Sequence, residues 1–119
     1  MSWYSYIKTA DKSPQEQAKQ EQERLLCGMC FKWAMQWSID HQLGNHKVVH
    51  GMVTGGLEMK TFGHAWIEDG DTIYDERHTD GISRDLFYEA LNPEDTVKYT
   101  PTEATRALFK HKQWGPWHN

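Results

Sequence analysis

The chain's two cysteines, Cys27 and Cys30, lie three residues apart in the segment LCGMCFKWA. A Cys-x-x-Cys pair can bind a metal ion, cycle between dithiol and disulfide, or contain one nucleophile beside a cysteine with another role. Each chemistry requires different neighbours: further ligands, a preceding β-strand, or a general base. The residues around the pair, and the histidines elsewhere in the chain, decide among the three.

A zinc site would need two more ligands beside the cysteines, because structural zinc is bound by four side chains in a tetrahedron. The chain has seven histidines, and spacings typical of zinc ligands occur at His41/His46 and at His46/His50. Cys27 and Cys30 with His46 and His50 form a ligand set of acceptable spacing. A small zinc-stabilised domain therefore stays open as an alternative.

Redox chemistry is disfavoured by the segment that precedes the cysteines. Dithiol oxidoreductases place Cys-x-x-Cys at the start of a helix directly after a β-strand, where the helix N-terminus lowers the thiol pKa. Here the motif follows the polar run QEQERLL, which is typical of a solvated helix. No βαβ pattern follows the motif, although such a pattern usually accompanies the redox motif.

A general base for a cysteine nucleophile is predicted by the segment GHAWIEDGDTIYDE. Asp69-Gly70 is a strong signal for a two-residue hairpin turn, and a turn at these residues pairs His64 with Asp75. Directly opposed residues share one face of the sheet, with their Cβ atoms roughly 4.5–5.5 Å apart. The carboxylate is therefore expected to bind the imidazole, orient it and fix its tautomer.

Cys30 is the cysteine that a helix would activate. Residues from about Cys30 to Asp40 predict a helix that is apolar around most of its circumference and is therefore buried. A cysteine in the first turn of a helix lies near the positive end of the helix dipole, which stabilises the thiolate. Amides near it can form part of an oxyanion hole. Candidates for a further oxyanion donor are Gln20, Gln22 and Trp66.

The elements that must position these residues follow a helix–sheet–helix order, which is typical of an α+β domain. Helical patterns occur at 13–26, 30–40, about 84–91 and about 101–112. Short β-branched or aromatic segments between turn residues predict antiparallel strands at 47–53, 57–62, 64–68 and 71–75. Thr100 and Glu103 form a capping box at the start of the last helix. At 119 residues the chain is expected to be one domain, residues 1–119.

Four motifs follow one another along the chain: Gly28-x-Cys30-x-x-x-Ala34, VVHGMV at 48–53, His64-Ala65-Trp66-Ile67-Glu68 and Tyr74-Asp75. Together they resemble the core of the transglutaminase-like superfamily. The resemblance implies a minimal papain-like fold, in which a buried helix carrying the cysteine packs on a small antiparallel sheet and is followed by C-terminal helices. It also implies Cys30 as nucleophile, His64 as general base and Asp75 as orienting acid, with Cys27 as a bystander.

Two features separate this chain from calcium-dependent transglutaminases. The residues after Asp75 are Glu76-Arg77-His78-Thr79, where many members of the superfamily have Pro-Thr, and the chain has no Asp-rich metal loop like theirs. The resemblance therefore implies a small microbial or phage-type hydrolase. Its activity would be thiol-dependent acyl transfer on an amide bond of a peptide or protein substrate, as hydrolysis or glutamine deamidation. No metal ion or other cofactor is implied.

A binding module without catalysis is the alternative from another class. Such a module would keep the same fold and use some of the chain's six tryptophans to hold a peptide or protein. Tryptophans also bury large areas in ordinary cores, so their number alone does not distinguish a core from a binding groove.

Composition argues against several classes of partner. The formal net charge of −4 and the pI near 5.9 give no sign of the basic footprint of a nucleic-acid-binding protein, so we expect no nucleic-acid partner. No apolar run approaches the roughly 20 residues that span a bilayer, so no membrane partner is expected. The N-terminal segment lacks the apolar region of a secretory signal, and we therefore expect a cytoplasmic protein whose thiols stay reduced.

Overall fold

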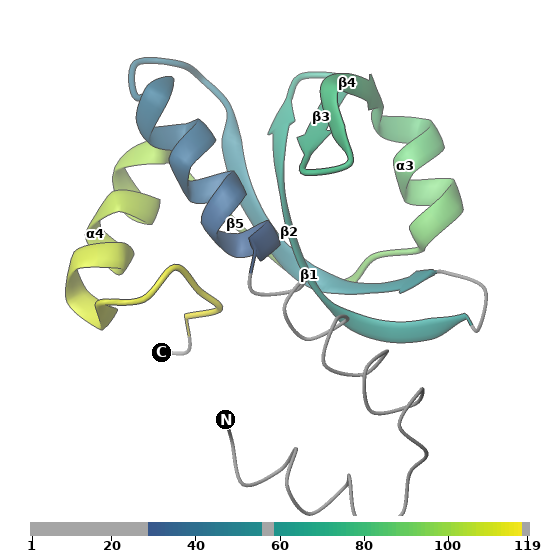
Figure 1. Cartoon of the computed structure of the whole chain (residues 1–119). Helices are drawn as coiled ribbons and strands as arrows, with labels where there is room; N and C mark the ends of the chain where they lie inside the picture. The colour runs from purple at the N-terminus through teal and green to yellow at the C-terminus, as the bar shows by residue number, and fades with distance from the viewer. Residues whose placement is uncertain (1–28, 56–58, 118–119) are drawn as a thin grey trace, which may run out of the picture.

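A computed structural model of the chain describes residues 29–55 and 59–117 (Figure 1). Five strands form one antiparallel sheet with the order β4-β3-β2-β1-β5. They are β1 (Lys47–Gly55), β2 (Lys60–Asp69), β3 (Thr72–Asp75), β4 (His78–Ser83) and β5 (Glu94–Tyr99). This sheet and the helices beside it confirm the predicted α+β class.

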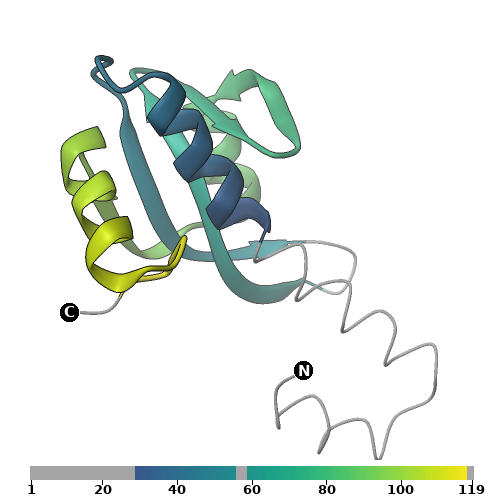
Figure 2. The ribbon, with the colours of Figure 1, turned by 60° about the vertical axis from the view of Figure 1, so that its left-hand side comes forward.

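Three helices of the described residues flank the sheet. They are the helix over residues 29–40, named here the Cys30 helix, α3 (Arg84–Leu91) and α4 (Pro101–His111). The Cys30 helix and α4 lie on one side of the sheet and α3 lies on the other, as Figure 1 and Figure 2 show. The helices predicted at 84–91 and 101–112 are confirmed, and the one predicted at 30–40 is present.

The alternation of side chains along β2 divides the apolar residues into two clusters. Ala65 and Ile67 pack with the Cys30 helix and α4, whereas Trp66 packs with α3. Successive residues of a strand point to opposite faces, so one strand can supply both clusters. His64 is two residues from Trp66 and therefore belongs to the α3 side of the sheet.

The last helix begins as its sequence predicts. The Thr100 side chain accepts a hydrogen bond from the backbone N–H of Glu103, and the Glu103 carboxylate accepts one from the backbone N–H of Thr100. Pro101 occupies the first helical position, where no intrahelical donor is needed. Such a capping residue is worth about 1 kcal/mol relative to alanine. The predicted capping box is confirmed.

The hairpin between β2 and β3 has a different register from the predicted one. The turn consists of Gly70 and Asp71, because Asp69 pairs with Thr72 and Ile67 pairs with Tyr74. Gly70 has a φ of 63° and stands first in the turn, the position where a type II′ turn requires a left-handed residue. The prediction of Asp69-Gly70 as the turn was wrong: the turn lies one residue later, which shifts every cross-strand pair by two residues. An even shift leaves each side chain on its predicted face.

The strands that sequence patterning missed are the two edges of the sheet. β4 has the sequence HTDGIS and β5 has EDTVKY, and most of their residues are exposed or half-buried. Neither strand shows the apolar alternation of a half-buried strand, so hydrophobic periodicity did not detect them. The described end of the segment predicted at 57–62 and the segment predicted at 64–68 belong to one strand, β2, from Lys60 to Asp69.

Some predictions fall on segments that the structure does not describe. The predicted helix at 13–26 lies outside the described residues, as does the position of Cys27. Within residues 29–55 and 59–117, no helix combines the length and apolar character needed to cross a membrane.

Candidate active site

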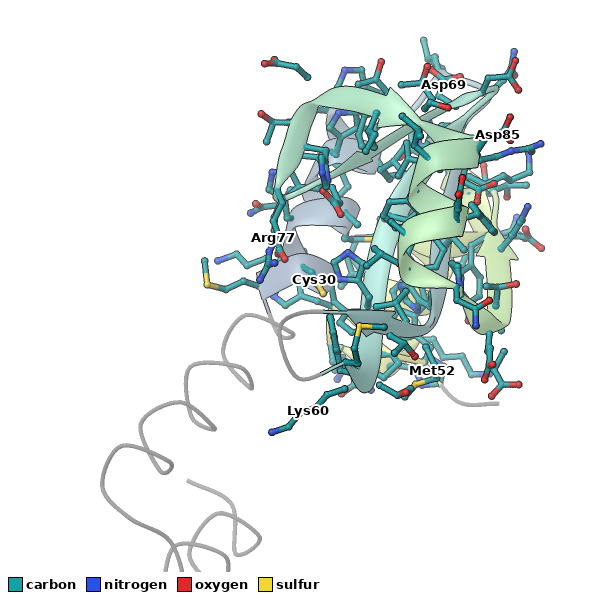
Figure 3. All side chains as sticks on the ribbon, turned by 90° about the vertical axis from the view of Figure 1, so that its right-hand side faces the viewer. Cys30, Met52, Lys60, Asp69, Arg77 and Asp85 are labelled. Atoms are coloured by element: carbon teal, nitrogen blue, oxygen red, sulfur yellow. The ribbon has the colours of Figure 1, made fainter. Side chains whose placement is uncertain are left out.

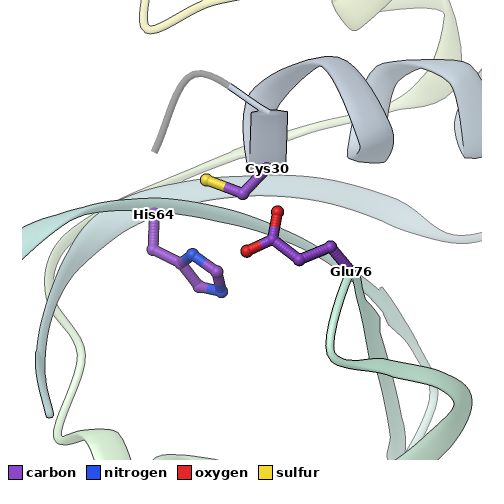
Figure 4. A group of neighbouring side chains, drawn as sticks. All are labelled: Cys30, His64 and Glu76. Atoms are coloured by element: carbon purple, nitrogen blue, oxygen red, sulfur yellow. The ribbon is translucent and has the colours of Figure 1, made fainter. Parts of the chain in front are cut away.

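Cys30, His64 and Glu76 come together although they belong to three segments. Cys30 lies in the Cys30 helix, His64 in β2, and Glu76 in the turn after β3. Their sulfur, nitrogen and oxygen atoms all lie within 4.8 Å of one another (Figure 4). The structure thus brings the predicted nucleophile to the predicted base, beside a carboxylate that the sequence analysis did not include.

β3 is shorter than β2, so the part of β2 that carries His64 has no strand of the described residues paired to it on that side. β3 pairs with β2 only over Ile67–Asp69, so His64 lies beyond the end of that pairing. The turn after β3 and the Cys30 helix both approach β2 there. Figure 3 shows Cys30 and Arg77, a residue of that turn, on the same side of the molecule.

The hydrogen bond that the hairpin predicted between His64 and Asp75 is present. Nε2 of His64 lies 3.1 Å from Oδ2 of Asp75. In the observed register, extension of the pairing would place Asp75 opposite Trp66, so Asp75 is a diagonal neighbour of His64. Diagonal neighbours on one face remain within reach of longer side chains. The predicted contact is therefore made through a different pairing from the predicted one.

The carboxylate of Asp75 is surrounded by donors. Oδ2 faces His64, while Oδ1 accepts hydrogen bonds from the backbone N–H of Arg77 at 3.0 Å and of His78 at 2.7 Å. Oδ1 also lies 2.8 Å from Nδ1 of His78. The two backbone bonds close the turn after β3, as aspartate side chains commonly do in turns. The turn therefore fixes the carboxylate that orients His64.

These donors keep Asp75 ionised although it is only 1% exposed. Burial by itself raises the pKa of Asp75, but hydrogen bonds and charge attraction from His64 and His78 outweigh burial and lower it from 3.8 to about 2. The side chain is therefore a carboxylate at neutral pH and in mild acid.

The ionised carboxylate determines the tautomer of neutral His64. A carboxylate only accepts hydrogen bonds, so Nε2 of His64 must carry the proton that points to Asp75. Nδ1 then has the lone pair, and it is the ring nitrogen left for the group formed with Cys30 and Glu76. A neutral imidazole in this tautomer can accept a proton from a thiol.

Aromatic rings enclose the remainder of the His64 side chain. The ring centroids of Trp66 and Phe87 lie 5.8 Å and 6.3 Å from that of His64, both in stacked orientation. Phe62 contacts the same ring edge-on at 6.1 Å. These contacts restrict the orientation of the imidazole, in addition to the hydrogen bond from Nε2.

Cys30 lies on the buried face of its helix. Its side chain is 1% exposed and packs in the cluster that contains Ala34 and Ala65. Cys30 and Ala34 are four residues apart, so they lie on the same face of the helix. The start of this helix lies outside the described residues, and the place of Cys30 in its first turn therefore stays a prediction.

Glu76 and His78 are the site residues that the sequence analysis missed. Burial raises the pKa of Glu76, with a smaller opposing effect of His64. Its Oε2 atom is buried and has no hydrogen-bond partner among the described residues. The only available signal was their position directly after Asp75, in the segment where the chain departs from the Pro-Thr of the superfamily.

The proposed oxyanion donors gain no new support. The indole N–H of Trp66 donates to Oε1 of Glu68 at 3.2 Å, so this donor already has an acceptor on the same face of the sheet. Glu68 is held in turn by Tyr88 and by Lys98, whose Nζ lies 3.0 Å from Oε2. Gln20 and Gln22 lie outside the described residues.

The histidines of the zinc alternative lie in other surroundings. Nε2 of His46 is 2.8 Å from the hydroxyl of Ser38, and His50 packs against the rings of Phe31 and Trp117. In the part of the chain that the structure describes, the metal-ligating group around Cys30 contains His64 and Glu76, and it includes neither His46 nor His50.

Comparisons with known proteins add no assignment to this geometry. No family model, curated protein or solved structure matches the chain.

Proposed function

We propose that the chain is a cysteine peptidase or amidase of the transglutaminase-like kind, built on a minimal papain-like core. The proposal rests on one arrangement: Asp75 binds Nε2 of His64, and Cys30 and His64 approach each other in the same group. A histidine that a carboxylate orients beside a thiol is the arrangement that cysteine hydrolases use to form and stabilise a thiolate. The expected substrate is a peptide or protein, and the expected compartment is the cytoplasm.

The first half of the reaction forms a thioester. Nδ1 of His64 takes the proton from the Cys30 thiol, and the thiolate attacks the carbonyl carbon of the substrate amide. The tetrahedral intermediate collapses as the His64 imidazolium gives its proton to the leaving nitrogen. The amine, or ammonia from a glutamine side chain, departs and the acyl group stays on Cys30.

The second half regenerates the thiol. Nδ1 of His64, neutral again, takes a proton from a water molecule as the water oxygen attacks the thioester carbon. The C–S bond then breaks, the carboxylic acid leaves, and Cys30 recovers its proton from the imidazolium. Asp75 remains ionised in every step and stabilises the imidazolium that forms twice in the cycle.

Negative charge on the substrate oxygen needs donors of its own. The Trp66 indole is engaged by Glu68, so we assign this role to backbone amides near Cys30, which is where a helix presents unpaired N–H groups if Cys30 lies in its first turn. Hydrolysis and glutamine deamidation use the same atoms and differ only in the nitrogen that leaves.

The test is the alkylation rate of Cys30 as a function of pH, with Cys27 in the same molecule as the internal control. A chelator is present throughout, and the two alkylated peptides are quantified separately by mass spectrometry. We expect Cys30 to react at a pH well below the value of about 8.5 that is ordinary for a thiol. The variant His64→Ala should remove that advantage.

Two results would overturn the proposal. One is a Cys30 profile that matches an ordinary thiol in the correctly folded protein. The other is an unusual Cys30 profile that His64→Ala leaves unchanged, because the base would then have no role. Where the profile behaves as expected, peptide and glutamine amides are tested for a mass increase on the Cys30 peptide, which identifies the acyl-enzyme.

A further inference from the structure

The group around Cys30 has one more member than a catalytic thiol requires. The thiol chemistry above uses Cys30, His64 and Asp75, whereas Glu76 has no part in it. The atoms of Cys30, His64 and Glu76 lie within 4.8 Å of one another and represent three kinds of ligand: sulfur, nitrogen and oxygen. We propose that these three side chains bind a divalent metal ion such as Zn²⁺ or Co²⁺, and that the bound ion blocks the Cys30 thiol.

The distances suit an ion after small movements of the side chains. Zinc binds sulfur at about 2.3 Å and nitrogen or oxygen at about 2.0–2.2 Å, so tetrahedral ligand atoms lie about 3.3–3.6 Å from one another. The present limit of 4.8 Å requires a closure of about 1 Å. Rotation of the Glu76 side chain and of the Cys30 thiol can supply this closure without movement of the sheet.

His64 is already held as a metal-bound histidine is held. A histidine that binds a metal through one ring nitrogen almost always donates its other N–H to a carboxylate, a carbonyl or water. Nε2 of His64 lies 3.1 Å from Oδ2 of Asp75, so Nδ1 has the lone pair that a metal requires. This observation is independent of the Cys30–Glu76 approach and supports the same ion position.

The charges of the group also suit a divalent cation. Oε2 of Glu76 is buried without a hydrogen-bond partner among the described residues. A buried carboxylate oxygen in that state is unfavourable unless a cation or donor reaches it. Thiolate and carboxylate together carry two negative charges, which balance the two positive charges of the ion.

The mixture of ligands selects among ions. Calcium and magnesium prefer sites made of oxygen, whereas zinc and cobalt accept thiolate, imidazole and carboxylate together. Three protein ligands leave a fourth position for water, which is the coordination number of open zinc sites. Binding releases the thiol proton of Cys30 to solvent and changes no oxidation state.

Metal binding and thiol chemistry exclude each other at this site. The ion uses the sulfur of Cys30 and the lone pair of His64 Nδ1, which are the nucleophile and the base of the proposed reaction. A bound ion would therefore protect Cys30 from alkylation. The metal site does not depend on the proposed reaction, because the three ligands can bind an ion whether or not the thiol attacks an amide.

The first experiment titrates the metal-free, reduced full chain with Co²⁺ in the absence of chelator and of thiol reductants. We expect near-ultraviolet charge-transfer absorption of a cobalt–thiolate bond that saturates at one ion per chain. Zn²⁺ should displace the cobalt and abolish the absorption. Zn²⁺ should also slow the alkylation of Cys30 in the unsubstituted protein, and a chelator should reverse this protection.

Substitutions then assign the ligands. Cys30→Ser should abolish the charge-transfer band. Asp75→Asn removes no ligand but changes the partner of His64 Nε2 and the acceptor that closes the turn carrying Glu76, and it should weaken binding by about 10–100-fold. Glu76→Gln removes a direct ligand and should weaken binding at least as much. Glu89→Gln, the same change at an exposed residue of α3, is the matched control and should leave the affinity for Co²⁺ unchanged.

Three results would overturn the proposal: no cobalt–thiolate band in the folded chain, a Co²⁺ affinity equal in Glu76→Gln and Glu89→Gln, or a band that Cys27→Ser abolishes. The last result would assign the ion to the Cys-x-x-Cys pair. If Glu76→Gln does not fold, absence of Zn²⁺ protection of Cys30 in the unsubstituted protein would still overturn it. The alkylation profile with chelator tests the reaction separately, so the two proposals can fail independently.

Discussion

His50 and His64 are near neighbours in the sheet with the same exposure and opposite chemical surroundings. Each is 5% exposed, and they lie on the adjacent strands β1 and β2, where Gly51 pairs with His64. His64 has the carboxylate of Asp75 at one ring nitrogen and the Cys30 group near the other. Both ring nitrogens of His50 are buried with no hydrogen-bond partner among the described residues.

The surroundings of His50 are aromatic. Its ring centroid lies 4.7 Å from that of Phe31, 5.2 Å from that of Tyr99 and 4.8 Å from that of Trp117. Burial lowers the pKa of His50 from 6.5 to about 4, so the ring is neutral at neutral pH. The comparison shows that burial of a histidine does not identify a site. The polar partners that reach it do.

Substitutions of the two histidines should differ most in their effect on the reactivity of Cys30. An ordinary thiol with a pKa of about 8.5 is about 1% thiolate at pH 6.5. His64→Ala should therefore lower the Cys30 alkylation rate at that pH by up to about 100-fold, whereas His50→Phe should leave it within about twofold. Equal losses in the two variants would contradict the assignment of His64 as the specific base.

The next largest effect is the loss of stability in mild acid through His50. In the unfolded chain His50 gains its proton near pH 6.5, but in the folded protein only near about 4. Between these values the unfolded state binds more protons, so the free energy of unfolding falls as the pH is lowered from 6.5 to about 4. The full loss is on the order of 3 kcal/mol.

Urea unfolding at the two ends of this interval measures the effect. His50→Phe replaces the ring by one of similar shape that cannot be protonated, so this variant should lose much less stability between pH 6.5 and 4. A variant with the same acid dependence as the unsubstituted protein would show that another group causes the loss.

Asp75 is expected to cause a second loss of stability, at a lower pH than the loss caused by His50. Its pKa is lowered from 3.8 to about 2, so its contribution to stability is present above 3.8 and is lost as the pH falls toward 2. This contribution is on the order of 2 kcal/mol. Asp75→Asn should remove the dependence in this interval and retain that of His50 above it, as urea unfolding at each pH can test. If His50→Phe and Asp75→Asn both lost stability over the same continuous pH range, the two effects would not be separate.

The smallest expected effect concerns Gly115, which closes one side of the His50 surroundings. Its φ is 128°, and a Cβ atom there would lie 2.7 Å from Cε1 of His50 and 2.9 Å from Cδ1 of Phe31. Gly70 also has a positive φ but has open space around it. Gly70→Ala should cost about 1 kcal/mol of unfolding free energy.

Gly115→Ala should cost about 1 kcal/mol more than Gly70→Ala, because a steric clash is added to backbone strain. Thermal unfolding of the two variants side by side gives the difference. Equal losses would mean that the segment around Gly115 can move away from His50 without penalty.

Sequence reasoning succeeded where one short-range rule sufficed. The capping box at Thr100 follows from residue identity within one turn of helix, and the contact of His64 with Asp75 follows from the alternation of a hairpin. That contact survived an error in the turn, because a shift of two residues preserves the face of each side chain.

Sequence reasoning failed where the structure depends on partners distant in sequence. β4 and β5 are polar edge strands that exist because β3 and β1 provide backbone partners, which hydrophobic periodicity does not detect. Glu76 reaches Cys30 only because β3 ends early and the helix approaches the same edge. The surroundings of His50 depend in the same way on the C-terminal segment, whose Trp117 packs against His50. No local pattern in β1 predicts this contact.

That returning segment has a practical consequence for how the protein is handled. Trp117 contacts His50, His50 contacts Phe31, and Phe31 is the residue next to Cys30. Trp117 and Cys30 also belong to the same apolar cluster. A truncation that removes Trp117, or a fusion tag joined tightly after it, would therefore disturb the packing behind Cys30 from the far end of the chain. Assays of Cys30 should therefore keep Trp117 and attach no tag directly after it.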